Sequence, residues 1–381
     1  MTKVIPLNSP NLVGNEMRYL KDCINTNWIS TSGKYIKSFE SKICNFTGSK
    51  YAVACINGTS ALQVSLRLVG VKKNDEIIVP TLTFIAPVNA IKYNEAYPIF
   101  MDVDEFHNID IKKTIEFLKT KTFRKGKFTF NKKTKRRIIA IIPVHVWGNA
   151  SDFSNLKTIC KNMNIKIVED ASESLGTIYT SGKFKNKHTG INGDIGCISF
   201  NGNKIATTGG GGVILTDNYN LAKNARYLIS QAKDDIYNFV HNEVGYNFKL
   251  TNIHAALGLA QLEKINFFLN RKKNISKYYR KNIISKNFKI LNQPQCSNNN
   301  NWMNILTLKK NRKIYFLKKI VSDFKKNKIE YRFIWKANHL QKPYKKSQTY
   351  KIAHANRIIS SSVCIPSCTS LNQNQLKKIV S

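Results

Sequence analysis

The chain has 381 residues, of which 42% are hydrophobic, and 61 Lys and Arg against 23 Asp and Glu give a formal net charge of +38. This apolar content excludes a disordered chain. No apolar run is long enough to span a membrane, and the first residues lack the apolar core of a signal peptide. We therefore expect a cytoplasmic protein. The basic residues are dispersed and no nucleic-acid-binding signature accompanies them. We therefore expect no nucleic-acid partner, although a positive field would attract a phosphate-bearing substrate.

Short β-branched runs alternate with amphipathic stretches along the first 250 residues. This alternation predicts an α/β fold with a mostly parallel, seven-stranded sheet covered on both faces. The expected strands are 51–55, 76–80, 97–101, 138–145, 165–169, 196–200 and 212–216, and the expected helices include 60–69, 84–93, 152–162 and 221–230.

The pattern changes near residue 250. Residues 252–265 predict one long helix, and the asparagine-rich stretch 292–301 is typical of a surface loop without chemistry. A short α+β segment follows. We therefore predict a large domain at 1–250 and a small C-terminal α+β domain at 251–381.

A candidate phosphate site follows the first expected strand. There, Gly58, Thr59 and Ser60 open a helix. Backbone amides at a helix N-terminus suit a phosphate, and glycine lets an anion approach closely. Simple capping of the helix by Thr59 or Ser60 is the other interpretation.

Other side chains follow strand ends at what would be the same edge of the sheet. Asp170 could hold a protonated ring nitrogen or could cap the next segment, and Phe84 could stack on a flat ring or belong to the core. His145 could contact a ligand or be a structural histidine with both nitrogens satisfied. The eight cysteines lack the spacing of a zinc site, and no metal site is indicated.

Lys204 lies between an apolar strand and the glycine run 209–212. The glycines follow the lysine and lack the spacing of a P-loop, which excludes that motif. A phosphate cup, an aromatic ring, a carboxylate and a lysine, each after a strand, together favour pyridoxal phosphate (PLP) as the cofactor.

With these features in order, the chain resembles the DegT/DnrJ/StrS sugar aminotransferases, which are fold-type I PLP enzymes, over nearly its whole length. The blocks that carry the resemblance are 5–7, 27–33, 39–40, 57–62, 80–84, 143–145, 169–171, 199–204, the glycine run, 245–248, 334–335, 339–341 and 365–367.

The resemblance implies a role for each matching residue. Lys204 would bind the cofactor covalently and move protons, and Asp170 would pair with the ring nitrogen. Glu173 stands near the ring hydroxyl, where the family usually has glutamine, and Lys249 stands where it usually has arginine. The remaining cofactor contacts would come from Phe84, Gly58, Thr59, Ser60, Ser199 and, from the neighbouring subunit of an obligate homodimer with shared sites, Asn247.

The resemblance also suggests the reaction. L-glutamate would donate its amino group to the C4 ketone of a nucleotide-linked sugar, and the branch looks like the one acting on UDP-linked 4-keto-6-deoxy-N-acetylhexosamines for bacillosamine or legionaminic-acid type surface glycans. GDP- or dTDP-linked sugars, a sugar dehydratase (which carries histidine in place of Lys204) and a non-catalytic binding protein are the alternatives. The expected substrate contacts are Trp28, Ser30, Ser32, His145, Arg332 and His339.

Overall fold

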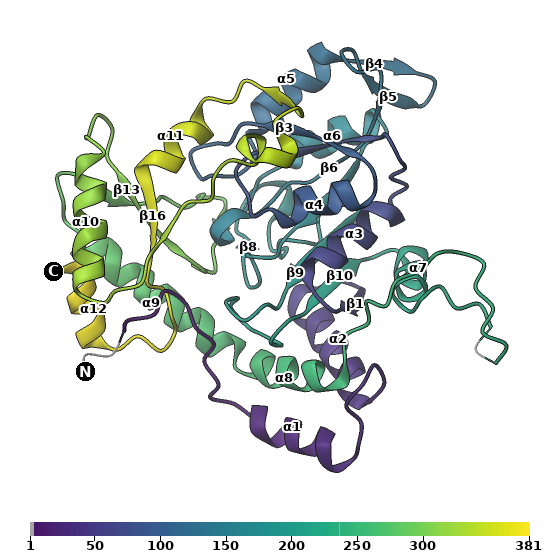
Figure 1. Ribbon diagram of the computed structural model, residues 1–381, viewed down its shortest axis with the longest axis horizontal. Coiled ribbons are helices and arrows are strands. Elements are labelled where there is room, and N and C mark those ends of the chain that lie inside the picture. Colours follow the sequence, from purple (N-terminus) through teal and green to yellow (C-terminus); the bar gives the residue numbers. More distant parts are fainter. Residues whose placement is uncertain (1–3, 236) are drawn as a thin grey trace.

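A twisted, mostly parallel sheet forms the centre of the molecule in the computed structural model, which describes residues 4–235 and 237–381 (Figure 1). Its strand order is β1-β10-β9-β7-β6-β2-β3, with β10 antiparallel to both of its neighbours. The α/β fold class is confirmed. All seven expected strands are present, as β1 (Tyr51–Cys55), β2 (Glu76–Pro80), β3 (Tyr97–Met101), β6 (Arg137–Ile141), β7 (Lys166–Asp170), β9 (Ile195–Ser199) and β10 (Gly212–Thr216).

The expected count of seven strands is too low. Within the described residues the sheet has ten, because β15 (Gln348–Tyr350) pairs in parallel with β3 and the hairpin β4 (Thr122–Lys125)–β5 (Phe128–Asn131) pairs with β6. The hairpin mixes apolar and polar residues and exposes residues 124–127, and β15 has only three residues. Neither segment has the apolar run that reveals a buried strand.

Helices cover both faces of this sheet. Alternate residues of β2 show the two faces, since Ile77 and Val79 join one hydrophobic cluster and Ile78 joins another. On the first face lie α3 (Gly58–Leu68), α4 (Ala86–Tyr93) and α7 (Tyr219–Ile229), and on the second lie α5 (Ile111–Lys121) and α6 (Ser154–Asn162).

A second, antiparallel sheet lies in the C-terminal part, in the order β11-β13-β16-β14. The expected helix 252–265 is confirmed as α8 (Asn252–Glu263) and ends two residues early, because the chain leaves helical geometry at Lys264 before α9 (Ile265–Asn282) begins. The elements of this part are α8 (Asn252–Glu263), α9 (Ile265–Asn282), β11 (Phe288–Ile290), β13 (Asn304–Leu308), α10 (Tyr315–Lys326), β14 (Arg332–Phe333), α11 (His354–Ser361), β16 (Ser362–Ile365) and α12 (Gln373–Val380).

Several segments connect the two parts. Helix α8 packs against α1 (Glu16–Asn25) and α2 (Lys34–Thr47), and the isolated bridge between Ile5 and Ile329 ties the N-terminal segment to the C-terminal part. Strand β12 (Ser297–Asn298) pairs with β8 (Ile178–Tyr179). The domain boundary at residue 250 stays a prediction. Across the described ranges, we find no helix with the length and apolarity that a membrane span requires.

Candidate active site

A cavity of about 250 Å³ opens at the carboxyl edge of the large sheet. The loops after β1, β2 and β6 and the ends of β7 and β9 all reach it, since these strands run in the same direction. Parallel topology therefore brings together side chains that are far apart in sequence. Eight of the expected site residues line the cavity: Gly58, Thr59, Phe84, Asp170, Glu173, Ser199, Lys204 and Arg332.

Lys204 presents its amine to this cavity from a tight turn. Its backbone N–H donates to the Asn201 carbonyl at 3.0 Å, and only 14% of its side chain is exposed. The Nζ atom lies 3.7 Å from Glu173 Oε1 and 4.2 Å from the centre of the Trp302 ring. A carboxyl group and an indole face therefore both lie close to the amine.

Two buried carboxyls accompany the amine. Burial raises the pKa of Glu173 to about 7, although the charge of Lys204 and a 2.8 Å hydrogen bond from the backbone N–H of Trp147 act in the opposite direction. Burial also raises the pKa of Asp170, whose Oδ1 accepts a 3.0 Å hydrogen bond from Ser172 N–H. A cationic group beside Asp170 would offset the cost of ionising it.

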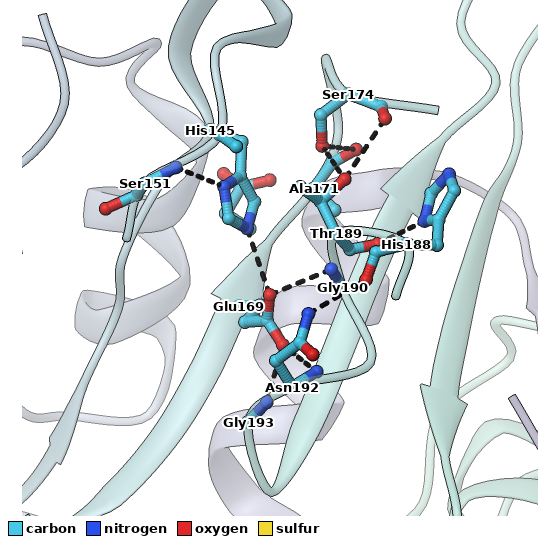
Figure 2. Close-up of polar contacts among 12 residues, drawn as sticks. His145, Ser151, Glu169, Ala171, Ser174, His188, Thr189, Gly190, Asn192 and Gly193 are labelled. Carbon is cyan, nitrogen blue, oxygen red and sulfur yellow. Dashed lines mark hydrogen bonds and ion pairs between the residues drawn. The ribbon is translucent and has the colours of Figure 1, made fainter. Parts of the chain in front are cut away.

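Glu169, next to Asp170 on β7, points to the other side of the strand and does not line the cavity. It is fully buried and accepts hydrogen bonds from His145 Nε2 at 3.0 Å and from the backbone N–H groups of Gly190 at 2.8 Å and Gly193 at 2.5 Å (Figure 2). Burial opposes ionisation of Glu169, but these donors outweigh it and lower the pKa of the carboxyl. Glu169 therefore fixes the loop 190–193, in which Gly190 lies close to Ala171.

His145 is also part of this network. Its Nδ1 accepts a 3.0 Å hydrogen bond from the backbone N–H of Ser151, which leaves the proton on Nε2, facing Glu169 (Figure 2). The ring is fully buried and does not line the cavity. The expectation of a substrate contact is corrected: both ring nitrogens are already bonded, so His145 is the structural histidine of the alternative interpretation.

The expected phosphate cup lies at the start of α3. Asn57 caps this helix, because its Oδ1 accepts a 2.8 Å hydrogen bond from Ser60 N–H, and neither Thr59 nor Ser60 is the cap. A Cβ on Gly58 would lie 3.0 Å from the Ser199 Cβ, so glycine permits the close approach of α3 to the end of β9. Ser60 itself is buried outside the cavity lining.

The glycine run allows equally close packing. A Cβ on Gly212 would lie 2.4 Å from the Asn57 backbone, and one on Gly211 would lie 2.2 Å from Thr208 Oγ1. Strand β10 can therefore begin directly against the cup. These glycines shape the cup through backbone contact.

An aromatic wall completes the cavity, and three of its four rings, those of the tryptophans, were not expected from the sequence. The rings of Trp147 and Trp335 lie 4.2 Å apart at 19°, Trp302 is 6.1 Å from Trp147 at 16°, and Phe84 is 6.1 Å from Trp335. The wall comes from four segments that are distant in sequence. The only sequence signal was that Trp335 and Phe84 lie in blocks shared with the family.

The stretch 292–301 is also closer to the site than expected. Asn300 is 2% exposed, and its Nδ2 donates to the carbonyls of Glu173 at 2.8 Å and Leu175 at 2.9 Å. This stretch supports the Glu173 segment. The expectation of a surface loop is wrong there, because polar composition does not distinguish solvation from internal hydrogen bonding.

The other expected substrate and subunit contacts lie elsewhere in the chain. His339 bonds Thr81 Oγ1 at 2.6 Å through Nδ1 and is not among the lining residues. Trp28 and Ser32 line a separate cavity of about 880 Å³, while Ser30 is exposed and its carbonyl accepts from Asn252 N–H at 2.6 Å. Asn247 is exposed and outside the Lys204 cavity.

Comparison with known proteins agrees with this geometry. The model of the DegT/DnrJ/EryC1/StrS aminotransferase family matches residues 10–381. The chain belongs to this family. The inferred resemblance, enzyme class and cofactor are thereby confirmed: the protein is an aminotransferase that uses PLP.

Two curated relatives carry the same name. GDP-perosamine synthase of Escherichia coli O157:H7 is 38% identical over 283 residues, which are 74% of this chain and 72% of the relative. GDP-perosamine synthase of Vibrio cholerae is 30% identical over 377 residues, 99% and 97% of the two chains. Among solved structures, Helicobacter pylori PseC, an aminotransferase involved in the biosynthesis of pseudoaminic acid, has a TM-score of 0.88 at 23% identity and covers 99% of this chain and 97% of its own.

The residues of the cavity fit PLP. Because Gly58 has no Cβ, a space remains between Gly58 and Ser199, which we call the Gly58–Ser199 cradle. A phosphate could approach the backbone N–H groups closely there. Asp170 is a buried carboxyl without a cationic side chain at ion-pair distance among the described residues, which suits a protonated ring nitrogen. Lys204 supplies the amine and Phe84 an exposed ring face.

Proposed function

We propose that the protein transfers the amino group of L-glutamate to the C4 ketone of a nucleotide-linked 4-keto-6-deoxy sugar. The observation that carries this proposal is the convergence of Lys204, Asp170 and Glu173 on one cavity beside the Gly58–Ser199 cradle. An amine that shares a desolvated space with two carboxyls can exchange protons without competition from water.

Each group of cavity residues would have a separate role in the proposed reaction. Bound PLP would supply a conjugated, electron-withdrawing ring. Asp170 would keep a positive charge on the ring nitrogen, and Gly58, Thr59 and Ser199 would hold the phosphate. Lys204 Nζ would take a proton from the reacting carbon of glutamate and return a proton at the sugar carbon, with Glu173 Oε1 at 3.7 Å as its nearest carboxyl.

For the sugar, we propose a GDP-linked hexose as the first candidate. Two relatives that cover most of the chain are named GDP-perosamine synthases, which supports a GDP-linked substrate over the UDP-linked N-acetylhexosamine that the sequence suggested. The Arg332 guanidinium lines the cavity and offers charge and paired donors to a diphosphate.

We also propose that a second copy of the chain completes each site. Asn247, Trp28 and Ser32 lie outside the Lys204 cavity and are exposed, so residues of these segments can reach a cofactor only in another subunit. Lys249 lines the same 880 Å³ cavity as Trp28 and would bring positive charge to a phosphate.

A spectroscopic and kinetic experiment tests the proposed function. The purified protein should show the yellow absorbance of lysine-bound PLP, which L-glutamate should bleach, and Lys204→Ala should lack the band. The bleached enzyme should then aminate a GDP-linked 4-keto-6-deoxy hexose, with UDP- and dTDP-linked ketones as comparisons. Absence of the band after PLP addition would refute the catalytic role of Lys204, and preference for a UDP-linked ketone would refute the choice of nucleotide.

A further inference from the structure

A lysine outside the cavity lining is buried, and no carboxylate among the described residues pairs with it. Lys272 on α9 is 1% exposed, and its Nζ donates to Asn8 Oδ1 at 3.1 Å and to the carbonyls of Trp302 at 2.9 Å and Ser367 at 2.6 Å. An ammonium has three donors, and each of these has an acceptor. None of the ion pairs among the described residues includes Lys272.

Such a group is costly to bury. Desolvation lowers the pKa of Lys272 to about 7, and a methionine of similar length would avoid that cost. A purely space-filling role therefore does not account for a lysine at this position. Its three acceptors belong to the N-terminal segment, the segment after β12 and the segment after β16, which α9 brings together (Figure 1).

Residues of two of these three segments also donate hydrogen bonds to one carbonyl oxygen next to Lys204. Asn8 Nδ2 donates to the carbonyl of Asn203 at 2.5 Å, and Trp302 Nε1 donates to that carbonyl at 2.7 Å. Asn203 directly precedes Lys204, and the Trp302 ring is the one that lies 4.2 Å from the Lys204 amine. The Asn203 side-chain oxygen is buried and has no hydrogen-bond partner among the described residues, so the main-chain carbonyl, which accepts two hydrogen bonds, anchors this residue.

We propose that Lys272 is a positioning residue, which acts through Asn8 and Trp302 to fix the Asn203 carbonyl and thereby the orientation of the Lys204 amine. This proposal rests on Lys204 being the reactive amine of the proposed function. Lys272 does not line the Lys204 cavity, so it acts only through its neighbours. It holds the Asn8 amide and the Trp302 backbone where both can bond the turn, and a small error in the placement of a reacting group can cost about 100-fold in rate.

The test uses the PLP-loaded enzyme and three substitutions, Lys272→Met, Asn8→Ala and Trp302→Phe. Trp302→Phe keeps an aromatic face beside the amine but removes the Nε1 donor, and Asn8→Ala leaves Lys272 in place. Lys273→Met, on the exposed face of the same helix, is the matched control. The measurements are the pH at which the absorbance of the lysine-bound cofactor changes, and kcat and KM for glutamate.

All three substitutions should shift the absorbance transition in the same direction by about half a pH unit or more and lower kcat about 10- to 100-fold with a smaller change in KM. Lys273→Met should change neither. If Lys272→Met does not fold, the other two variants carry the test. A lower melting temperature with an unmoved absorbance transition would overturn the proposal and leave Lys272 a purely structural residue. Failure of the proposed function gives a different result, since the native enzyme would then lack the band itself.

Discussion

Replacement of Glu173 by glutamine should change how the stability of the protein depends on pH. The folded-state pKa of this carboxyl is about 7, compared with 4.5 in the unfolded chain, because the carboxyl is buried. Between these values the folded protein keeps a proton that the unfolded chain releases, so the contribution of Glu173 to stability falls as pH rises from 4.5 to 7. Glutamine carries no titrating proton, yet its side-chain oxygen can still accept from Trp147 N–H.

The magnitude follows from the difference between the two pKa values. One pH unit corresponds to about 1.4 kcal/mol, so the full cost of the ionised carboxyl is about 3 kcal/mol. Between pH 5 and pH 8, the free energy of unfolding of the native protein should fall by about 2–3 kcal/mol relative to that of Glu173→Gln.

Urea denaturation of both proteins at pH 5, 6, 7 and 8, without added cofactor, measures this difference, and titrating groups that do not interact with Glu173 cancel in the comparison. Glu105→Gln makes the same chemical change at an exposed position and should leave the pH dependence unchanged. A constant gap between native protein and Glu173→Gln over this range would refute the argument that Glu173 is protonated in the folded state near neutral pH.

Three further predictions concern the surroundings of the cavity. Glu169→Gln should lower the free energy of unfolding by about 1–3 kcal/mol, because an NH₂ group would face backbone N–H donors; unchanged urea denaturation would contradict this. Gly58→Ala should weaken PLP binding in a fluorescence titration, because the new Cβ would lie 3.0 Å from the Ser199 Cβ, whereas Gly210→Ala, with open space around its Cβ, should not; equal affinity in both variants would rule out the cradle. In a mixed dimer of Asn247→Ala and Lys204→Ala chains, one site keeps both native residues if sites are shared, so about half of the native activity should return; no recovery in the purified mixed dimer would refute sharing.

The sequence predicted the part of the site that depends on strand order. Apolar runs located the seven long strands, and parallel topology then required Gly58, Phe84, Asp170 and Ser199 to meet at one edge. Regular local patterns and a simple rule of sheet geometry were sufficient for these residues.

The parts that depend on contacts between distant loops were not predictable. No periodicity connects Trp147, Trp302 and Trp335, which meet only because three loops fold over the same cavity. His145 follows a strand end as Asp170 does, and only the backbone N–H of Ser151 and the direction of Glu169 show that it is bonded away from the cavity.

Strand β15 links the edge of the large sheet to the last tenth of the chain. It pairs with β3, which lies about 250 residues earlier, so a growing chain leaves that edge of β3 unpaired until synthesis is almost complete. An unpaired strand edge is a template for aggregation. A fragment that ends near residue 250 should therefore be poorly soluble, and late-stage truncations should harm folding even though they remove no residue of the Lys204 turn.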